Sequence, residues 1–189
     1  MANSEQSFSL RLQSTVYCTA FFNGTVQTMA TTIVALLLVA TINPELTLLI
    51  GLIIAARQFL TVTMSIYGGA LMDRHGTKQV IIMFGFLGVV SSLSFPLTGA
   101  IFGIDLGVAN ESPPWAFIAT LIMLQMLSGY AEATGWIGSQ TLVGQLMKGH
   151  PVYAGRMTFA ARIGGFIGPI SIGVSWDQFG AWGGFGFLA

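Results

Sequence analysis

Three charged residues stand inside long apolar stretches of this chain: Arg57, Glu132 and Arg162. A charged side chain in the middle of a membrane span costs at least about 2.5–3.5 kcal/mol on insertion scales, so it needs a partner or a water-filled cavity. Residues of this kind mark ion pairs, proton relays and solute pathways in membrane proteins. These three are therefore the first candidates for a functional role.

Uncharged polar residues extend this set. Asn23, Gln27 and Thr31 recur at every fourth position, which places them on one face of a helix. Gln125 shares a helix face with Glu132 at seven-residue spacing. One interpretation is a substrate pathway lined by Asn23, Gln27, Arg57, Gln125 and Glu132. The alternative is hydrogen bonding between helices, which contributes around 0.6 kcal/mol for each bond.

Depth along the predicted helices indicates how the charges pair. At 1.5 Å per residue, Arg57 lies roughly 16 Å from the start of its helix and Glu132 roughly 25 Å, counted from the same side. Arg162 enters from the opposite side by roughly 10 Å, which brings it near the level of Glu132 in a ~30 Å core. We therefore expect Glu132 to pair with Arg162, and Arg57 to meet Gln125 or the cavity. Such a pair would hold helices together, whereas an unpaired Glu132 facing water could carry protons.

The residues that enzymes and metal sites need are missing from the sequence pattern. His75 and His150 stand in polar connections, and neither has the cysteine, histidine or carboxylate neighbours of a metal site. The chain has no phosphate-binding loop, dinucleotide fingerprint or nucleophile–base arrangement. We predict a protein that is not an enzyme and that uses neither a cofactor nor a metal.

Composition defines the class of protein. The chain has 189 residues, of which 53% are hydrophobic and only 7% are charged, whereas soluble domains have roughly 25% charged residues. Its net charge is zero, so nothing favours nucleic acid as a partner. We predict an all-α integral membrane protein whose main partner is the lipid bilayer. The expected spans are residues 17–40, 46–71, 80–102, 115–142 and 155–175, with a partial sixth at 181–189.

The charges of the connections predict the orientation in the membrane. One set of alternating connections carries Arg11, Arg74, Lys78, Lys148 and Arg156. The other set carries Glu45, Asp105, Glu111 and Asp177 and no lysine or arginine. By the positive-inside rule, the N-terminus is cytoplasmic, in what we expect to be the cell's inner (plasma) membrane.

The segment Gly69–Ile81, with the sequence GALMDRHGTKQVI, places charged residues and two glycines between two apolar spans. It resembles the signature loop of the major facilitator superfamily of transporters, Gly-x-Leu-x-Asp-Arg-x-Gly-Arg-Lys-x-x-(Ile/Leu), which lies between that family's second and third helices. Thr77 replaces the first base of the usual pair. The matching residues are Gly69, Leu71, Asp73, Arg74, Gly76, Lys78 and Ile81.

Two other spans are similar to motifs of the same family. Gly164, Gly168 and Pro169 resemble the glycine–proline motif of its antiporter and drug-exporter branches, and we expect them to give a bend and close packing. The fourth span resembles a motif in which proton-coupled members usually carry arginine at the position of Gln125.

The resemblance implies a fold and a function. It implies that residues 1–189 form the N-terminal half of a facilitator domain, a six-helix half-bundle truncated in helix 6, with a C-terminal half or a partner membrane subunit still to be added. It also implies a secondary transporter, either a uniporter or ion-coupled, that moves a small solute by alternating access. The signature-loop residues Gly69, Asp73, Arg74, Gly76 and Lys78 would then form its gate. The alternative from a different class is a non-transporting subunit, or a half-length fragment, that packs against a larger membrane complex.

Overall fold

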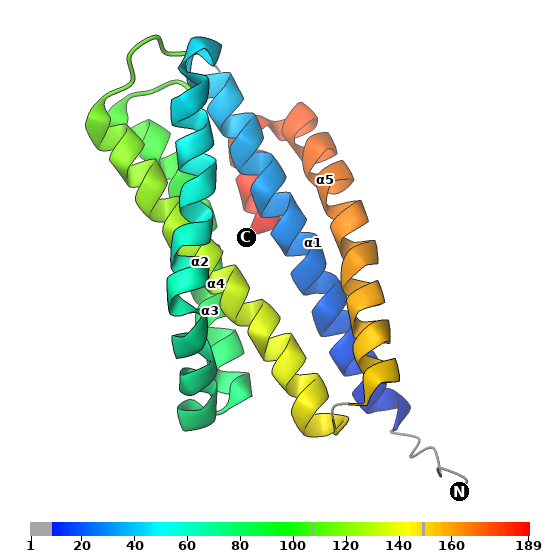
Figure 1. Cartoon of the computed structure of the whole chain (residues 1–189). Coiled ribbons are helices and arrows are strands. Elements are labelled where there is room, and N and C mark those ends of the chain that lie inside the picture. Colours follow the sequence, from blue (N-terminus) through cyan, green and yellow to red (C-terminus); the bar gives the residue numbers. More distant parts are fainter. Residues whose placement is uncertain (1–8, 107, 149) are drawn as a thin grey trace, which may run out of the picture.

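The computed structural model describes residues 9–106, 108–148 and 150–189, which form an all-α bundle (Figure 1). The helices are α1 (Leu10–Thr41), α2 (Thr47–His75), α3 (Thr77–Phe102), α4 (Trp115–Leu146) and α5 (Pro151–Leu188), with a short 3-10 turn, η1 (Pro44–Leu46), before α2. All five α-helices are long and apolar enough to cross a membrane. The fold is that of a multi-pass membrane protein, as the composition predicts.

The five predicted spans correspond to the five helices, but each helix is longer than its apolar run. α1 begins at Leu10, and α2 extends through Asp73 to His75. Charge-bearing turns can stay helical because a helix satisfies its own backbone hydrogen bonds and its ends reach beyond the hydrocarbon core. The signature segment is therefore almost entirely helical.

Gly76 is the one residue between α2 and α3. Its φ of 86° and ψ of 139° lie in a region that residues with a Cβ rarely adopt, so glycine permits this very short reversal. Its N–H donates to the carbonyl of Met72 (2.9 Å) and closes the last turn of α2. A hydrogen bond from the Thr77 hydroxyl to Gln145 Oε1 (3.2 Å) then ties the start of α3 to the end of α4.

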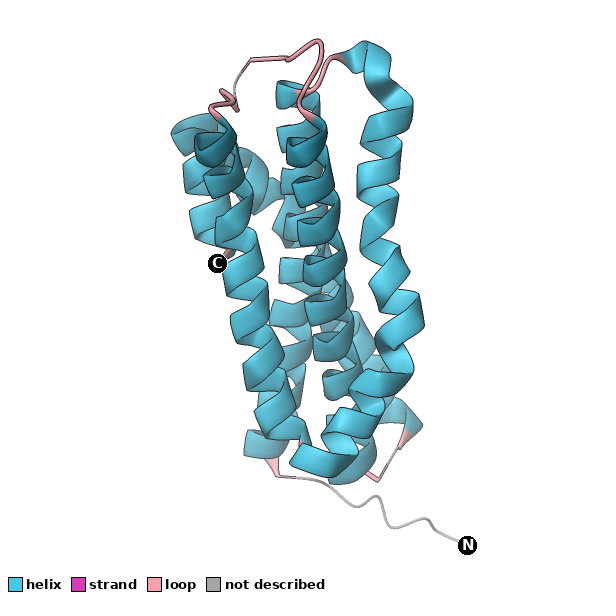
Figure 2. Cartoon of the chain, turned by 90° about the vertical axis from the view of Figure 1, so that its left-hand side faces the viewer, coloured by secondary structure: helices cyan, strands magenta, loops and turns pink. Residues whose placement is uncertain are grey.

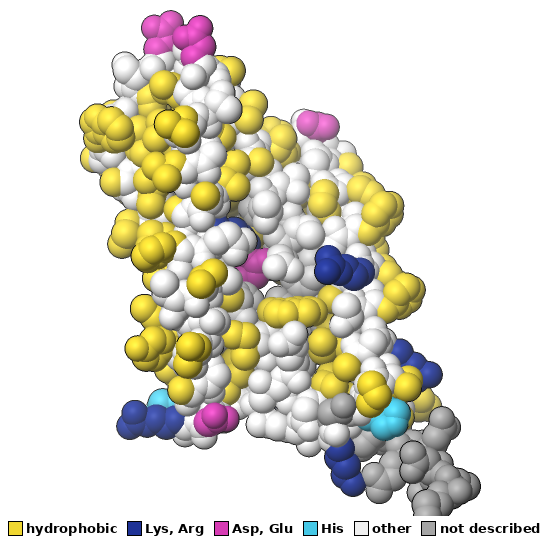
Figure 3. Space-filling model, viewed as in Figure 1, with side chains coloured by type: hydrophobic (Ala, Val, Ile, Leu, Met, Phe, Trp, Pro, Cys, Tyr) yellow, Lys and Arg dark blue, Asp and Glu magenta, His cyan; other side chains and the backbone are white. Residues whose placement is uncertain are grey.

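The helices alternate in direction, so the connections gather at two ends of the bundle (Figures 1 and 2). We call the end that holds Gly76 and the α4–α5 connection the basic end, and the other the acidic end; Figure 3 shows this separation of charge. At the acidic end the two connections are joined by backbone bonds from Asn110 N–H to the Thr41 carbonyl (2.8 Å) and from Asn43 N–H to the Asn110 carbonyl (3.2 Å).

Two groups of helices pack most closely: α1 lies along α5, and α2 and α3 both lie against α4. Glycine explains the first contact. A Cβ on Gly24 would overlap the backbone of Ala161, and one on Gly164 would overlap the carbonyl of Phe21. The two helices therefore meet backbone to backbone, which is how small residues favour association where water cannot drive it.

The helix α5 contains one non-helical residue, Gly180, with φ 63° and ψ −160°. There the chain turns, and the segment from Ala181 returns into the bundle behind α1 (Figure 1). Phe185 is fully buried in this segment and stacks on Phe95 of α3, with ring centroids 5.3 Å apart. The apolar run at 181–189, predicted as a partial sixth span, thus forms a helical piece after the break at Gly180 and packs against α3.

Candidate functional site

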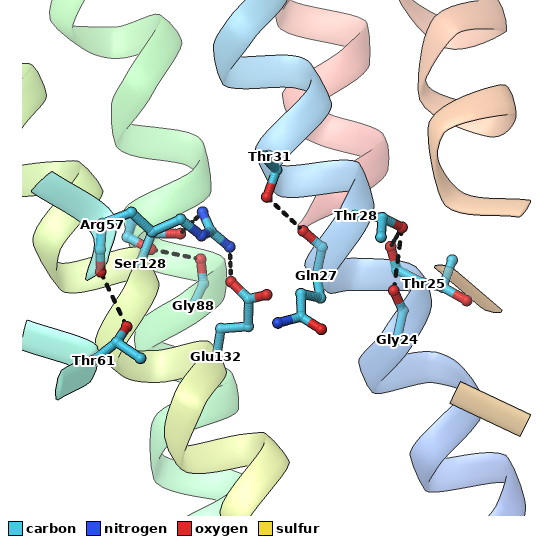
Figure 4. Close-up of polar contacts among 11 residues, drawn as sticks. Gly24, Thr25, Gln27, Thr28, Thr31, Arg57, Thr61, Gly88, Ser128 and Glu132 are labelled. Atoms are coloured by element: carbon cyan, nitrogen blue, oxygen red, sulfur yellow. Dashed lines mark hydrogen bonds and ion pairs between the residues drawn. The ribbon is translucent and has the colours of Figure 1, made fainter. Parts of the chain in front are cut away.

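Arg57 of α2 and Glu132 of α4 form an ion pair inside the bundle. Their side chains are only 7% and 8% exposed. Arg57 also donates to the hydroxyl of Ser128 (3.5 Å), one turn away on α4. Figure 4 shows the guanidinium directed at the carboxylate. Oε1 of Glu132 has no hydrogen-bond partner in the described part of the chain.

This pair corrects the prediction that Glu132 binds Arg162. Gly129 provides the physical reason, because a Cβ there would overlap the carbonyl of Arg57, so α2 and α4 cross in contact at this point. Arg57 is ten residues from the start of α2 and Gly129 is fourteen from the start of α4, which offsets the two starts by about 6 Å. Glu132 lies about 4.5 Å farther along, within the length of an arginine side chain. The depth count from each helix's own first residue left out the offset between the two helix starts and the length of the arginine side chain.

Arg162 lies elsewhere, on the exposed surface of α5. It makes no hydrogen bond or ion pair with the described residues, and it lines a hollow of about 300 Å³ between α1, α4 and α5. The α1 side of this hollow includes Gln27, and the α4 side includes Trp136. The full lining is Gly24, Gln27, Thr28, Trp136, Thr158, Ala161, Arg162 and Gly165. We call it the Arg162 pocket.

The polar face of α1 divides between two roles. Asn23 donates from Nδ2 to the hydroxyl of Ser139 (3.3 Å), so it joins α1 to α4 as the interhelical alternative predicts. Gln27 is exposed, and Figure 4 shows its amide on the side of α1 that faces Glu132. Thr31 donates its hydroxyl to the backbone carbonyl of Gln27 (3.0 Å). Of these residues, only Gln27 lines the Arg162 pocket.

A second hollow, of about 280 Å³, opens between α1, α3 and α4, and Glu132 is one of its lining residues. Its uncharged polar lining residues are Thr19, Asn23, Ser92 and Ser128, and most of its wall is apolar. Leu188 and Ala189 from the returning segment lie along it. Glu132 thus lines the mainly apolar hollow, whereas the lining of the Arg162 pocket does not include it.

Gln125 is not brought to either hollow. It is 1% exposed, and its Oε1 has no hydrogen-bond partner among the described residues. It lies on α4 one turn before Gly129, where α2 crosses closely. The structure places it between helices, two turns from Glu132, and the expected contact of Arg57 is made instead with Ser128 and Glu132.

The predicted gate residues lie together at the basic end. Asp73, Arg74 and Lys78 are exposed, and Gly76 forms the turn between them. Gly69 lies one to two turns earlier on α2, and a Cβ there would meet open space. The charged side chains are thus available to a neighbouring surface but are far along the helices from Arg57 and Glu132.

The residues of the predicted helix-5 motif pack against α1. A Cβ on Gly168 would overlap the hydroxyl of Thr28 and crowd the carbonyl of Thr25, and Gly164 makes a similar approach. Pro169 lies within α5, where the backbone stays helical, and the departure from helical geometry falls at Gly180. The motif gives close packing as predicted, while the sharp change of direction comes eleven residues later.

Sequence reasoning missed Gly129 and Trp136. Gly129 could have been noticed because it lies three residues before Glu132 on the same predicted helix, where a small residue permits a close crossing. Nothing in the sequence pattern marks Trp136, which lies at the Arg162 pocket because of the way α4 meets α1. No group of three or more potential metal ligands is found among the described residues.

Comparison of the chain with protein-family models, with curated proteins and with solved structures finds no match.

Proposed function

We propose that this chain forms the N-terminal half of a facilitator-type secondary transporter and lines a pathway for a small solute. The observation that carries the proposal is the concentration of charge at mid-height. Arg57, Glu132 and Arg162 are all the charged residues in the central parts of the five helices, and Gln27 lies at the same level.

Helix contacts give that common level. Asn23 of α1 bonds Ser139 and approaches Gly135 of α4. Since α1 and α4 run in opposite directions, Gln27 is level with Glu132. Ala161 of α5 meets Gly24, and α5 runs parallel to α1, so Arg162 is level with Thr25. The three charged side chains therefore fall within about two helical turns of one another.

The cost of charge in lipid supports a water-filled pathway. An exposed arginine at this level would face hydrocarbon unless the surface between α1, α4 and α5 is wet or covered. Transporters place their binding sites near the midplane, between two bundles that rock against each other. In the proposed arrangement the basic end is cytoplasmic, in the cell's inner membrane, and Asp73, Arg74 and Lys78 meet a facing bundle there.

Cysteine accessibility tests the pathway without knowledge of the solute. The native Cys18 is exposed and is first replaced by serine. Gln27→Cys is then compared with Phe86→Cys, which is 70% exposed on α3. Phe86 is at a similar depth, because neighbouring Gly88 approaches Ala131 of α4. The matched pair differs in whether the position lies at the Arg162 pocket or on the outer apolar face.

We expect a membrane-impermeant maleimide to modify Gln27→Cys in native membranes and to leave Phe86→Cys unmodified. Reaction from both sides of the membrane would support alternating access. Equal and low reactivity at the two positions would contradict the proposal and favour the alternative, a subunit whose α1–α5 face is covered by another membrane protein.

A further inference from the structure

Arg162 introduces a positive charge that the rest of the site does not balance. The charge of Arg57 is matched by Glu132. Arg162 lies about 17 Å along α5 from its first residue, is exposed, and has no ion-pair partner among the described residues. The mid-level of the bundle therefore carries one net positive charge in a region where an isolated charge is unfavourable.

The groups around Arg162 are suited to a negative partner. None of the residues that line the Arg162 pocket is acidic. Its hydroxyl groups already donate elsewhere, because Thr158 bonds the Ala154 carbonyl (3.1 Å) and Thr28 bonds the Gly24 carbonyl (3.2 Å). The donors that remain are the Arg162 guanidinium, the Gln27 amide and the Trp136 indole N–H.

The dimensions of the pocket restrict the ligand further. A volume of about 300 Å³ is at the lower end of the range for small-molecule sites. Guanidinium groups bind carboxylates and phosphates through two parallel hydrogen bonds. Trp136, Gly24, Ala161 and Gly165 also line the pocket and contribute its apolar surface beside those donors.

We propose that the Arg162 pocket binds a small organic anion, such as a carboxylate with an apolar body, as the transported substrate. This inference rests on the proposed transport function, whose solute it assigns to a chemical class. Arg162 would bind the anionic group, Gln27 would donate a further hydrogen bond, and Trp136 would contact the apolar part. Arg57 and Glu132 would neutralise each other and leave the selectivity to Arg162.

Binding to the full chain in lipid nanodiscs tests this proposal. The probe is benzoate, with benzamide and benzylamine as neutral and cationic molecules of similar shape, and inorganic phosphate as an anion with no apolar part. Calorimetric titration and the thermal unfolding midpoint are both followed. The variants are Arg162→Gln, Arg162→Lys and, as a matched control, Arg156→Gln, an arginine exposed on α5 closer to its start.

Benzoate should bind and raise the unfolding midpoint, while benzamide and benzylamine should not. Arg162→Gln should weaken benzoate binding by about tenfold or more, since a hydrogen bond to a charged group contributes about 1.5–3 kcal/mol. Arg162→Lys should retain part of the affinity, and Arg156→Gln should bind as the parent does. Equal binding of benzoate and benzamide, an unchanged affinity in Arg162→Gln, or no binding of either anion would overturn the proposal.

The two proposals can fail separately. If Gln27→Cys is accessible but neither anion binds, the pathway stands and the anionic substrate is wrong. If benzoate binds through Arg162 but proteoliposomes that contain the chain together with its C-terminal half do not take it up, the site stands and the transport function is wrong. A third outcome is that a carboxylate of another membrane protein occupies the pocket. Benzoate would then bind only after that protein is removed, and this result would also contradict a transported substrate.

Discussion

Glu132 of α4 and Arg57 of α2 form a buried ion pair. Gly129 allows the backbones of the two helices to approach closely at this point. The pair joins the two helices at the level where the proposed solute pathway crosses the bundle. Its removal should therefore affect folding as well as function, and the two effects have to be measured apart.

Neutralising one partner should be strongly destabilising. Arg57→Gln and Glu132→Gln each leave a buried charge without a partner, which costs roughly 3–5 kcal/mol of unfolding free energy. The double variant should lose less than the sum of the two single losses. Denaturant titration in mixed micelles measures these energies, with the exposed loop variant Glu111→Gln as the control. Single variants that match the control would contradict a buried pair.

Glycines between α1 and α5 should not accept a methyl group. Gly24→Ala and Gly164→Ala place a Cβ against opposing backbone, and such overpacking costs roughly 1–3 kcal/mol. Gly173→Ala is the matched control on α5, because a Cβ there meets open space. The measurement is the thermal unfolding midpoint in detergent. Equal midpoints for Gly164→Ala and Gly173→Ala would rule out the close contact.

The turn between α2 and α3 should require glycine for its backbone conformation alone. Gly76→Ala meets no neighbouring atom, yet it forces a residue with a Cβ to φ 86°, at a cost of about 1–3 kcal/mol. Gly69→Ala is helical and equally unobstructed, so it should be neutral or stabilising by up to about 1 kcal/mol. The unfolding midpoint of Gly76→Ala should therefore be clearly lower than that of Gly69→Ala.

The two ends of the bundle should be on opposite sides of the membrane. In a Cys18→Ser background, Glu111→Cys reports on the acidic end and His75→Cys on the basic end. An impermeant maleimide added to intact cells should label Glu111→Cys alone, and inverted vesicles should give the reverse. Labelling of His75→Cys alone in cells would invert the proposed orientation, and labelling of both would contradict the alternation of the helices.

The signature loop should act on the accessibility of the pathway without affecting folding. Asp73 is exposed, so Asp73→Asn should leave the unfolding midpoint unchanged. If Asp73 holds the cytoplasmic side closed, its loss should raise labelling of Gln27→Cys from that side. A contact of about 1 kcal/mol corresponds to about a fivefold change. Glu111→Gln is the control, and an unchanged ratio of labelling from the two sides would remove Asp73 from the gate.

Apolar runs and alternating charge were enough to predict five helices, their order and the separation of basic from acidic ends. These features depend on residue types summed over twenty positions, so single contacts do not alter them. The pairing of Glu132 was wrong because it depends on the crossing at Gly129, which offsets α4 against α2. The role of Trp136 depends on the rotation of α4 about its axis. A mean hydropathy of +0.76 indicates that the protein lies in a membrane, but it does not determine how any helix is rotated about its own axis.

The direct backbone contact between α1 and α5 has a mechanical consequence. The two helices touch at Gly24, Ala161 and Gly164 without intervening side chains that could rearrange. They should therefore resist sliding and move together as one rigid unit. α1 meets α4 through side chains such as Asn23 and Ser139, which can rearrange, so the α1–α4 contact is where the bundle can deform. Gln27 and Arg162 would move with the α1–α5 unit while Glu132 stays with α4. Any opening of the α1–α4 contact therefore changes the distance from Arg162 to the Arg57–Glu132 ion pair.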